Sequence, residues 1–532
     1  MKIYRLKYIL KSLIAIPWLL LSLLSCSRQG NDLTKNTLII AMSHDPATLD
    51  PRNTYLSRDA SLAKALYEGL TRITHKGVEL ALAESYTLSE DNTVYTFKLR
   101  PSLWSDGTPL TAYDFQESWR QMQFKEFSCS RPILLSVIKN SSAIVSGERT
   151  MEALGIHARD DLTLEILLEH PCPHFLELLA HPAFSPVHKS LRDYNITKYR
   201  DKYISNGPFI LKKYEHQNYL SLEKNPLYYD HQSVHLDSIT LKIIPDPSTA
   251  IKLFKNKSID WIGSPWSSAI SNEVQQALPK EKVHFYPVSS TTLLIYNLEK
   301  PPTQNKALRK AIAYAIDRTA ILRLVSPCEA AFTLVPPNLS QLNIQENISM
   351  EERHNKARAY FKEAKQTISD EELSQLNILY PIESFNFCIA IQEIQRQLKE
   401  VLGLKIKIQG IEYHCFLKKR RQGDFFMASA GWIAEYLSPM SFLRILGNPR
   451  DLTKWKNHDY EQTLANLNYA VTYQDHLKSK DYLKSAETMI EEETPIIPLY
   501  HSKYVYAINP KIQNTFGSLL GHMDLKNVEV VN

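Results

Sequence analysis

Hydrophobic residues alternate between strand-like and helix-like spacing along most of the chain. The continuous apolar run at 37–41 predicts a buried strand, and the alternation of apolar and polar residues at 93–99 predicts another strand. Residues 59–70 carry the spacing of a helix. Further strands are expected at 163–168 and at 239–244, the second with its apolar residues on one face.

Two later segments give stronger predictions of helices. At 306–325 the apolar residues form one stripe, and Pro327 is expected to stop the helix. At 388–402 a second stripe is followed by Gly403, a typical helix cap, and then by alternating apolar residues at 404–408. A helix, a glycine and a strand in this order form an α/β unit. The 532 residues suffice for two or three domains, and the lack of linker-like tracts favours domains that interleave.

The N-terminal residues resemble a secretion signal. Four basic residues precede an apolar run at 13–24, which is too short for a permanent membrane span. The run ends in Leu23-Leu24-Ser25-Cys26, which resembles a bacterial lipobox and implies cleavage before Cys26 and acylation of that residue. We expect a periplasmic or other extracytoplasmic protein held at the membrane by this lipid. The alternatives are a signal peptide with a chance cysteine and an uncleaved anchor.

The charge of the remaining chain argues against a nucleic-acid partner. The four basic residues of the N-terminal segment have no acid beside them, so their removal lowers the net charge from +5 to +1. A nearly neutral chain lacks the excess of positive charge that is typical of nucleic-acid-binding proteins. The 28 tyrosines against 15 glycines indicate large amphipathic contact surfaces rather than glycine-rich phosphate loops.

Sequence motifs give no support for an enzyme or a metal protein. GxxxxGK[ST], GxGxxG, HExxH and GxSxG are all missing from the sequence, and we expect no cofactor. His170, Cys172 and His174 lie close together, but two prolines separate them and no fourth ligand is apparent, so a partly buried turn is expected. Five cysteines follow Cys26 without a CxxC motif, which leaves one or two disulfides open.

Five segments, in the correct order, resemble landmarks of the bacterial extracellular solute-binding proteins of the oligopeptide, dipeptide and nickel type. They are 82–120 (which contains SDGTPLTAYDF), 205–211 (SNGPFIL), 222–230 (LEKNPLYYD), 308–318 (LRKAIAYAIDR) and 494–501 (TPIIPLYH). The likeness runs from about residue 37 to the end of the chain. It implies an α/β fold of the type II periplasmic-binding-protein class, a two-lobed clamp with an additional domain inserted near the N-terminus.

The resemblance also implies how the chain is divided and what it binds. The expected parts are a signal peptide at 1–25, lobe I at 26–68, 185–286 and 499–532, an inserted domain at 69–184, and lobe II at 287–498. Crossing segments are expected near 286 and 499. In this family a ligand binds between lobes that close by hinge motion, and the closed form meets an ABC permease whose ATPase subunits supply the energy. We expect a monomer.

The loop GWIAEYLSP at 431–439 is closest to that of the oligopeptide-binding proteins in this family. In them the acid of the loop pairs with the N-terminal ammonium of an extended peptide, and Glu435 would do so here. Backbone pairing with an extended peptide ignores side chains, so a fixed charge has to set its register. Trp432 would wall the adjacent side-chain pocket, and Gly431 and Tyr436 flank the acid.

The other expected ligand-binding residues depart from the family pattern. Basic residues that can meet the carboxylate end of a peptide are replaced by Ser429 and Phe387, and Tyr413 replaces a tryptophan. Tyr55 stands at the place of an acid near the first strand. Arg420 remains, and its bidentate fork suits a carboxylate, although its basic run is also compatible with a solvated helix end.

Other functions stay open at this point. The same clamp could bind a murein peptide or a metal chelate, although a carboxylate without companion ligands, such as Glu435, favours an amine over a metal complex. A secreted hydrolase would need a nucleophile–base pair, and none is found in the sequence.

Overall fold

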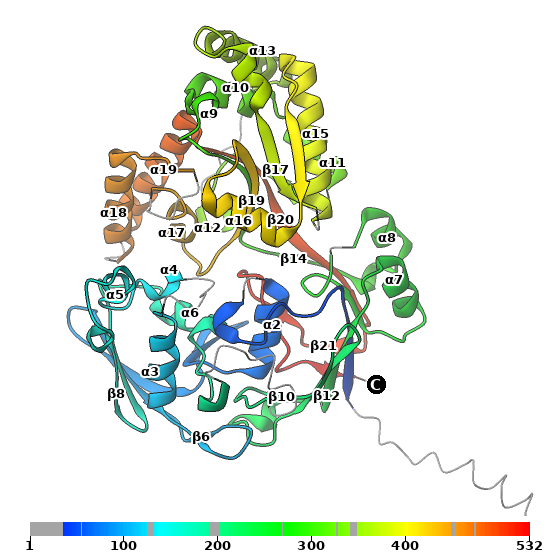
Figure 1. The fold of residues 1–532 in the computed structure, drawn as a ribbon. Helices are drawn as coiled ribbons and strands as arrows, with labels where there is room; N and C mark the ends of the chain where they lie inside the picture. Colours follow the sequence, from blue (N-terminus) through cyan, green and yellow to red (C-terminus); the bar gives the residue numbers. More distant parts are fainter. Residues whose placement is uncertain are drawn as a thin grey trace, which may run out of the picture.

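A computed structural model describes residues 36–54, 56–124, 132–191, 203–268, 270–325, 328–340, 348–382, 384–447, 453–472 and 475–531. These residues form two lobes with a third unit beside them (Figure 1). The expected lipid site at Cys26 and the expected ligand residue Tyr55 lie outside the described residues. Among the described helices, none is both long and apolar enough to cross a membrane.

One large mixed sheet runs through both lobes. Its strand order in the described residues is β10-β11-β12-β1-β13-β20-β15-β19-β17-β18, and β14 and β16 also pair with β20. The strands are β1 (Thr37–Met42), β10 (Phe209–Glu215), β11 (Tyr219–Lys224), β12 (Ser238–Ile243), β13 (Trp261–Gly263), β14 (Val283–Pro287), β15 (Ser290–Tyr296), β16 (Cys328–Ala330), β17 (Asn377–Pro381), β18 (Lys407–Ile411), β19 (Met427–Ile433) and β20 (Ile496–Ile508).

The strand β20 belongs to both lobes. Its first part pairs with β15, as in Thr292 opposite Tyr500, and its second part pairs with β14, as in Pro287 opposite Lys503. A second link is the short connection from β14 to β15, residues 288–289, both of which are buried. In Figure 1 β20 passes between the upper lobe (lobe II) and the lower lobe (lobe I). The two lobes are therefore joined by continuous backbone at only a few neighbouring positions among the described residues.

Helices cover the sheet in both lobes. Lobe I has α2 (Ser57–Leu66), α7 (Pro247–Lys255) and α8 (Asn272–Ala277), and its short strands are β21 (Ile512–Gln513), β22 (Phe516–Gly517), β23 (Met523–Asp524) and β24 (Glu529–Val530). A hairpin of β2 (Thr71–Thr74) and β3 (Gly77–Leu80) leads from lobe I into the third unit and is counted with that unit. Lobe II has α9 (Pro301–Gln304), α10 (Lys306–Ala315), α11 (Arg318–Leu324), α12 (Pro337–Ser340), α13 (Met350–Ala364), α14 (Asp370–Gln375), α15 (Phe385–Leu402), α16 (Tyr413–Gln422), α17 (Met440–Leu443), α18 (His458–Thr472) and α19 (His476–Glu493).

The third unit, which we call the inserted unit, is built on its own antiparallel sheet, in the order β4-β5-β9-β8. Its elements are β4 (Ala83–Leu88), β5 (Val94–Leu99), β6 (Ser102–Leu103), β7 (Pro109–Leu110), α3 (Ala112–Gln121), α4 (Pro132–Leu135), α5 (Ser141–Ser146), β8 (Ile156–Asp160), β9 (Thr163–Leu167) and α6 (Phe175–Leu179). The expected α/β fold, a two-lobed clamp with an insertion near the N-terminus, is confirmed.

Most predicted elements are found close to their expected positions. The strands predicted at 37–41, 93–99, 163–168 and 239–244 are β1, β5, β9 and β12, and the helix predicted at 59–70 is α2. This helix ends at Leu66, because Tyr67 already has extended backbone angles, with φ −128° and ψ 153°. Alternation located β5 and β12, which each have one face in the core, and the continuous apolar run located the largely buried β1.

Two boundary predictions are wrong. The single helix predicted at 306–325 is two helices, α10 and α11, because the side chain of Asp317 accepts hydrogen bonds from the backbone N–H groups of Thr319 (2.8 Å) and Ala320 (3.3 Å). Asp317 thus starts a new helix as its N-cap. The strand predicted at 404–408 begins only at Lys407, where pairing with Asn377 of β17 starts. Gly403 caps α15 as predicted, with φ of 69°.

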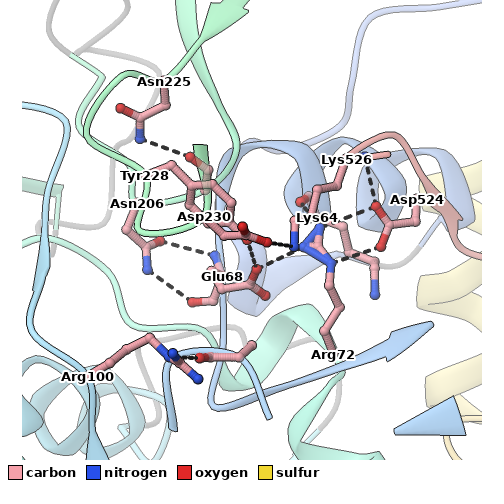
Figure 2. Close-up of polar contacts among 12 residues, drawn as sticks. Lys64, Glu68, Arg72, Arg100, Asn206, Asn225, Tyr228, Asp230, Asp524 and Lys526 are labelled. Atoms are coloured by element: carbon pink, nitrogen blue, oxygen red, sulfur yellow. Dashed lines mark hydrogen bonds and ion pairs between the residues drawn. The ribbon is translucent and has the colours of Figure 1, made fainter. Parts of the chain in front are cut away.

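A buried network of charges ties the C-terminal segment to lobe I (Figure 2). Arg72 lies between Glu68 and Asp524, with its Nη1 2.9 Å from Glu68 Oε2 and its Nε 2.8 Å from Asp524 Oδ2. The hydroxyl of Tyr228 donates to the same oxygen of Glu68 at 2.5 Å. Burial alone would raise the pKa of Asp524, but the nearby positive charges of Arg72 and Lys64 hold it below its ordinary value. Segments far apart in the sequence therefore form one rigid body.

Candidate ligand site at the lobe interface

The loop that follows β19 emerges at the edge of lobe II that faces the inserted unit. Strand β19 pairs antiparallel with β15, with Gly431 opposite Thr292 and Trp432 opposite Thr291. Gly431 is exposed, and the Phe387 ring lies 3.8 Å from the position that a Cβ on this glycine would take. The structure therefore places Phe387 beside the strand that leads into the loop.

Three hydrogen bonds, two from the backbone and one from a side chain, hold this loop from within lobe II. The backbone N–H of Ala434 donates to the carbonyl of Ser289 at 2.8 Å. Ser441 of α17 holds the loop twice, because its hydroxyl accepts the N–H of Glu435 at 2.8 Å and its carbonyl accepts the indole N–H of Trp432 at 2.7 Å. The loop is thus held in one conformation, which is what a preorganised binding group requires.

Glu435 is a buried acid with a cation in its neighbourhood. Its side chain is nearly closed off from solvent, with 5% of the residue exposed. Burial raises the pKa of the neighbouring Tyr436; the positive charge of Arg444 opposes this shift, and the charge of Glu435 adds to it. Glu435 and Arg444 therefore both lie near the Tyr436 hydroxyl. A buried carboxylate is costly unless a positive group compensates it, so this site favours cations.

The inserted unit contacts this loop from the other side. The ring of His174 lies flat on the ring of Tyr436, with centroids 3.9 Å apart and planes 6° apart. One helical turn later, Glu177 accepts the backbone N–H of Leu437 through Oε2 at 3.1 Å. The residues after Glu435 are thereby held between lobe II and the inserted unit. The sequence singled out His174 in its cluster with His170 and Cys172, but no sequence signal links it to Tyr436.

The expected turn around His170, Cys172 and His174 is confirmed. His170 is exposed, Cys172 is buried, and the segment is a turn that leads into α6. Within the described ranges no group of three His, Cys, Asp or Glu side chains could hold a metal ion. The described cysteines are free thiols: Cys172, Cys328, Cys388 and Cys415.

A second group of expected ligand residues gathers around Arg420 on α16. Its Nη1 donates to the carbonyl of Ser429 at 3.3 Å, and its guanidinium carbon lies 5.0 Å from the centre of the Phe416 ring. Burial lowers the pKa of Arg420 to about 10; the Tyr413 hydroxyl opposes this shift and Arg421 adds to it. The solvated helix end considered for this basic run therefore does not describe Arg420, although Lys418 and Arg421 are exposed.

Two polar atoms in this second group have no hydrogen-bond partner among the described residues. They are Nε of Arg420 and the hydroxyl of Ser429, a residue with 0% exposure. Buried polar groups are normally paired, so an unpaired donor and an unpaired hydroxyl mark a place where a ligand or water completes the bonds. The structure brings Arg420 and Ser429 together, with Tyr413 nearby.

A polar pocket of about 650 Å³ lies away from this interface, between the inserted unit and lobe I. Three of its charged residues already have partners: Arg100 donates to the carbonyl of Ala81 at 2.5 Å, and Lys526 lies 2.5 Å from Asp230. The lining residues are Glu79, Leu80, Arg100, Tyr229, Asp230 and Lys526. This pairing leaves the lobe interface as the stronger candidate site.

Two lobes are joined by a shared strand, and a fixed acidic loop of lobe II contacts the inserted unit; this architecture is that of a two-lobed clamp. The chain belongs to the bacterial extracellular solute-binding proteins, family 5, whose model matches residues 77–453. Within this family it is of the oligopeptide type, as its sequence resemblance predicted. Members of this family are substrate-binding proteins, not enzymes.

The relatives carry several different ligand names. The oligopeptide-binding protein OppA of Bacillus subtilis is 28% identical over 481 residues, which are 88% of this chain and 87% of the relative. The probable deoxycholate-binding periplasmic protein YgiS of Escherichia coli is 30% identical over 487 residues, 88% of each chain. The murein tripeptide binding protein MppA of E. coli has 26% identity and a TM-score of 0.81, covering 94% of this chain and 99% of that one.

A comparison within one relative indicates how the lobes are arranged here. The form of MppA described as unliganded and open gives a TM-score of only 0.69, at the same 26% identity and with 94% and 98% of the two chains covered. The other MppA structure gives 0.81. The lobes of the present structure are therefore arranged less like an open clamp, in agreement with the contact between His174 and Tyr436.

Proposed function

We propose that this chain captures short extended peptides between its lobes and delivers them to an ABC importer. The observation that carries the proposal is the buried carboxylate of Glu435 on a fixed loop at the lobe interface. Relatives named for oligopeptides, dipeptides and murein peptide support it.

The amino end of the peptide would bind at Glu435. A peptide ammonium placed there would complete the charge balance of a buried acid, and a ligand without an amine would leave that acid less well compensated. Arg444 would support the ionised carboxylate while the site is empty, because it lies near the same hydroxyl of Tyr436. Trp432 has its indole N–H bound to Ser441, so it would offer its apolar ring as a pocket wall.

The carboxylate end would bind at Arg420. Its Nε and the hydroxyl of Ser429 have no partner among the described residues, and the two residues are in contact through the Ser429 carbonyl, so both donors could serve a carboxylate. Phe387 supplies an apolar ring where relatives carry a cation, and Tyr413 lies near the guanidinium of Arg420. A peptide would reach this end by running past Gly431. Tyr55 stays a prediction.

The remaining features of the proposal concern the whole protein. We propose a lobe I of 26–68, 185–286 and 499–532, an inserted domain of 69–184 and a lobe II of 287–498, with hinges beside residues 288–289 and within β20. The signal peptide at 1–25 would be removed, and a lipid on Cys26 would hold the monomer at the outer side of a membrane, beside its permease. Acyl chains, in place of a membrane-spanning helix, would then be the anchor.

A co-purification experiment tests the proposal. The mature chain is purified without denaturation, the bound small molecules are released with acid, and mass spectrometry identifies them. We expect peptides with free amino ends. Recovery of metal chelates, or of no peptide after growth in a peptide-rich medium, would contradict the proposal, and turnover of added peptide would support the hydrolase alternative.

A steroid acid is the second candidate ligand. The observation that favours it is the 30% identity to the probable deoxycholate-binding protein YgiS, together with the Phe387 ring beside the binding strand. A steroid acid has a carboxylate for Arg420 and no amine for Glu435. Binding of deoxycholate that depends on Arg420 and ignores Glu435 would therefore identify this alternative.

A further inference from the structure

We propose that His174 and Glu177 of the inserted unit form a latch on the Glu435 loop, and that this latch helps hold the ligand-bound clamp closed. The proposal deepens the proposed function, because it rests on a ligand between the lobes. It assigns a positioning role to the inserted unit, whose residues are not otherwise part of the candidate ligand site.

The latch joins two bodies at adjacent residues of one loop. The stacked pair of His174 and Tyr436 has a centroid separation of 3.9 Å, and the bond from Leu437 N–H to Glu177 Oε2 is 3.1 Å long. Tyr436 and Leu437 directly follow Glu435. A movement of the inserted unit away from lobe II would break both contacts and return these groups to water.

Each side of the latch is firmly held in its own body. In the inserted unit, the ring of Phe175 packs against Tyr95 with centroids 4.9 Å apart, and the carbonyl of Leu176 accepts the hydroxyl of Thr71 at 2.7 Å. In lobe II, Ser441 fixes the loop at the N–H of Glu435 at 2.8 Å. Because each side of the latch is fixed within its own body, the contacts form only when the inserted unit lies against lobe II.

The chemistry of the latch suits a reversible contact. The Nδ1 atom of His174 is buried and has no hydrogen-bond partner among the described residues. Its desolvation disfavours the closed conformation, and the stacking on Tyr436 has to offset this free energy. Glu177 accepts one backbone N–H through its carboxylate, so this side of the latch is a single hydrogen bond. Such a contact further stabilises the closed conformation while a ligand is bound between the lobes. It breaks when the ligand dissociates and the clamp opens.

The experiment uses the full mature chain and two readouts. Hydrogen exchange monitors the amides of residues 434–440 with and without a pooled tripeptide library, and stopped-flow tryptophan fluorescence measures the dissociation rate of that library. We expect His174→Ala to raise exchange in 434–440 and to increase the dissociation rate about tenfold, because it raises the open population. Glu177→Ala should act in the same direction.

Conservative and neighbouring variants separate a latch from a general loss of structure. His174→Phe keeps the stacked ring and should retain wild-type exchange and dissociation, and Glu177→Gln keeps an acceptor for Leu437 N–H and should behave likewise. His170→Ala changes an exposed residue of the same turn and should have no effect.

Three results would overturn the latch. They are equal exchange in wild type and His174→Ala, raised exchange with an unchanged dissociation rate, and a defect in His174→Phe as large as in His174→Ala. Failure of the proposed function is recognised separately, since wild type would then not bind the library. In that case the exchange difference between His174→Ala and His174→Phe alone decides whether the latch joins the two bodies.

Discussion

The imidazole ring of His174 lies flat on the phenol ring of Tyr436, 3.9 Å away, although the two residues belong to different bodies of the protein. Tyr436 stands next to Glu435, which is the acid that we propose as the partner of a peptide ammonium. The proposed partner of the ligand and the proposed latch contact are therefore adjacent residues of one short loop.

Closure should weaken in mild acid. Burial, with a smaller effect from Arg444, lowers the pKa of His174 from 6.5 to about 3. Between these values an open clamp, with His174 in water, binds a proton that the closed clamp excludes, so a falling pH favours opening below about 6.5. Small-angle scattering of the peptide-bound protein should show expansion from pH 7 to pH 5.

The control for this pH effect is His174→Phe, which cannot titrate and should stay compact over the same range. Expansion of equal size in His174→Phe would contradict the assignment to His174, because another group would then be responsible. The titratable and charged groups that face His174 are Cys172, Glu177, Tyr436 and Arg444, with Glu435 next to them.

Arg420→Met should weaken binding of tripeptides with a free carboxylate by about tenfold, since a charge-assisted bond is lost. Binding of the same tripeptides with an amidated C-terminus should be nearly unchanged. Isothermal titration calorimetry measures both. The matched control is Lys418→Met, which removes an exposed cation from the same helix and should bind as wild type does. A similar loss for amidated peptides would show that Arg420 acts through packing.

Ser429→Ala should stabilise the ligand-free protein. The Ser429 hydroxyl is buried and has no partner among the described residues, so the substitution removes a desolvation cost of about 1 kcal/mol. Chemical denaturation monitored by tryptophan fluorescence gives the change. A loss of stability would mean that the hydroxyl is paired in solution, for example with an ordered water molecule.

Asp524→Ala should destabilise lobe I strongly. It leaves the buried Arg72 without one of its two carboxylate partners, and breaking a buried pair costs about 3–5 kcal/mol. The pKa of Asp524 is lowered in the folded state, so its contribution is present above its unfolded value of 3.8 and is lost as the pH falls further. Lys212→Ala, which breaks the exposed pair with Glu223, should cost less than about 1 kcal/mol. An equal loss of unfolding free energy in the buried-pair and the exposed-pair variants would contradict this account.

The sequence predicted the elements whose pattern is local. A continuous apolar run located β1, alternating apolar residues located β12, and the glycine after the second apolar stripe located the end of α15. The break between α10 and α11 escaped prediction because the apolar stripe continues across it, while the capping side chain of Asp317 decides the boundary. Short-range capping can thus override a continuous hydrophobic pattern.

The candidate site was predictable only as far as a family resemblance reached. Glu435 and Arg420 were named in advance; the structure shows that Glu435 is buried and that Arg420 is half-buried with its Nε atom closed off from solvent. The contacts of His174 and Glu177 with the loop could not be read from sequence, because they join segments of two separately folded bodies. Neither periodicity nor residue type specifies such a pairing.

Glu435→Ala should reduce the affinity for peptides at least about tenfold without unfolding the protein, since the ammonium loses its charged partner. Calorimetry gives the affinity, and thermal melting checks the fold. Glu435→Asp keeps the charge on a shorter side chain, and its affinity for peptides should lie between those of Glu435→Ala and wild type. An unchanged affinity for Glu435→Ala would remove Glu435 from the site.

The most direct test compares a tripeptide that binds wild type with its N-acetylated form, by calorimetry on wild type and on Glu435→Ala. If Glu435 recognises the ammonium, acetylation should weaken binding to wild type about a hundredfold and should have little further effect on Glu435→Ala. Equal affinity of wild type for the free and the acetylated peptide would contradict the account.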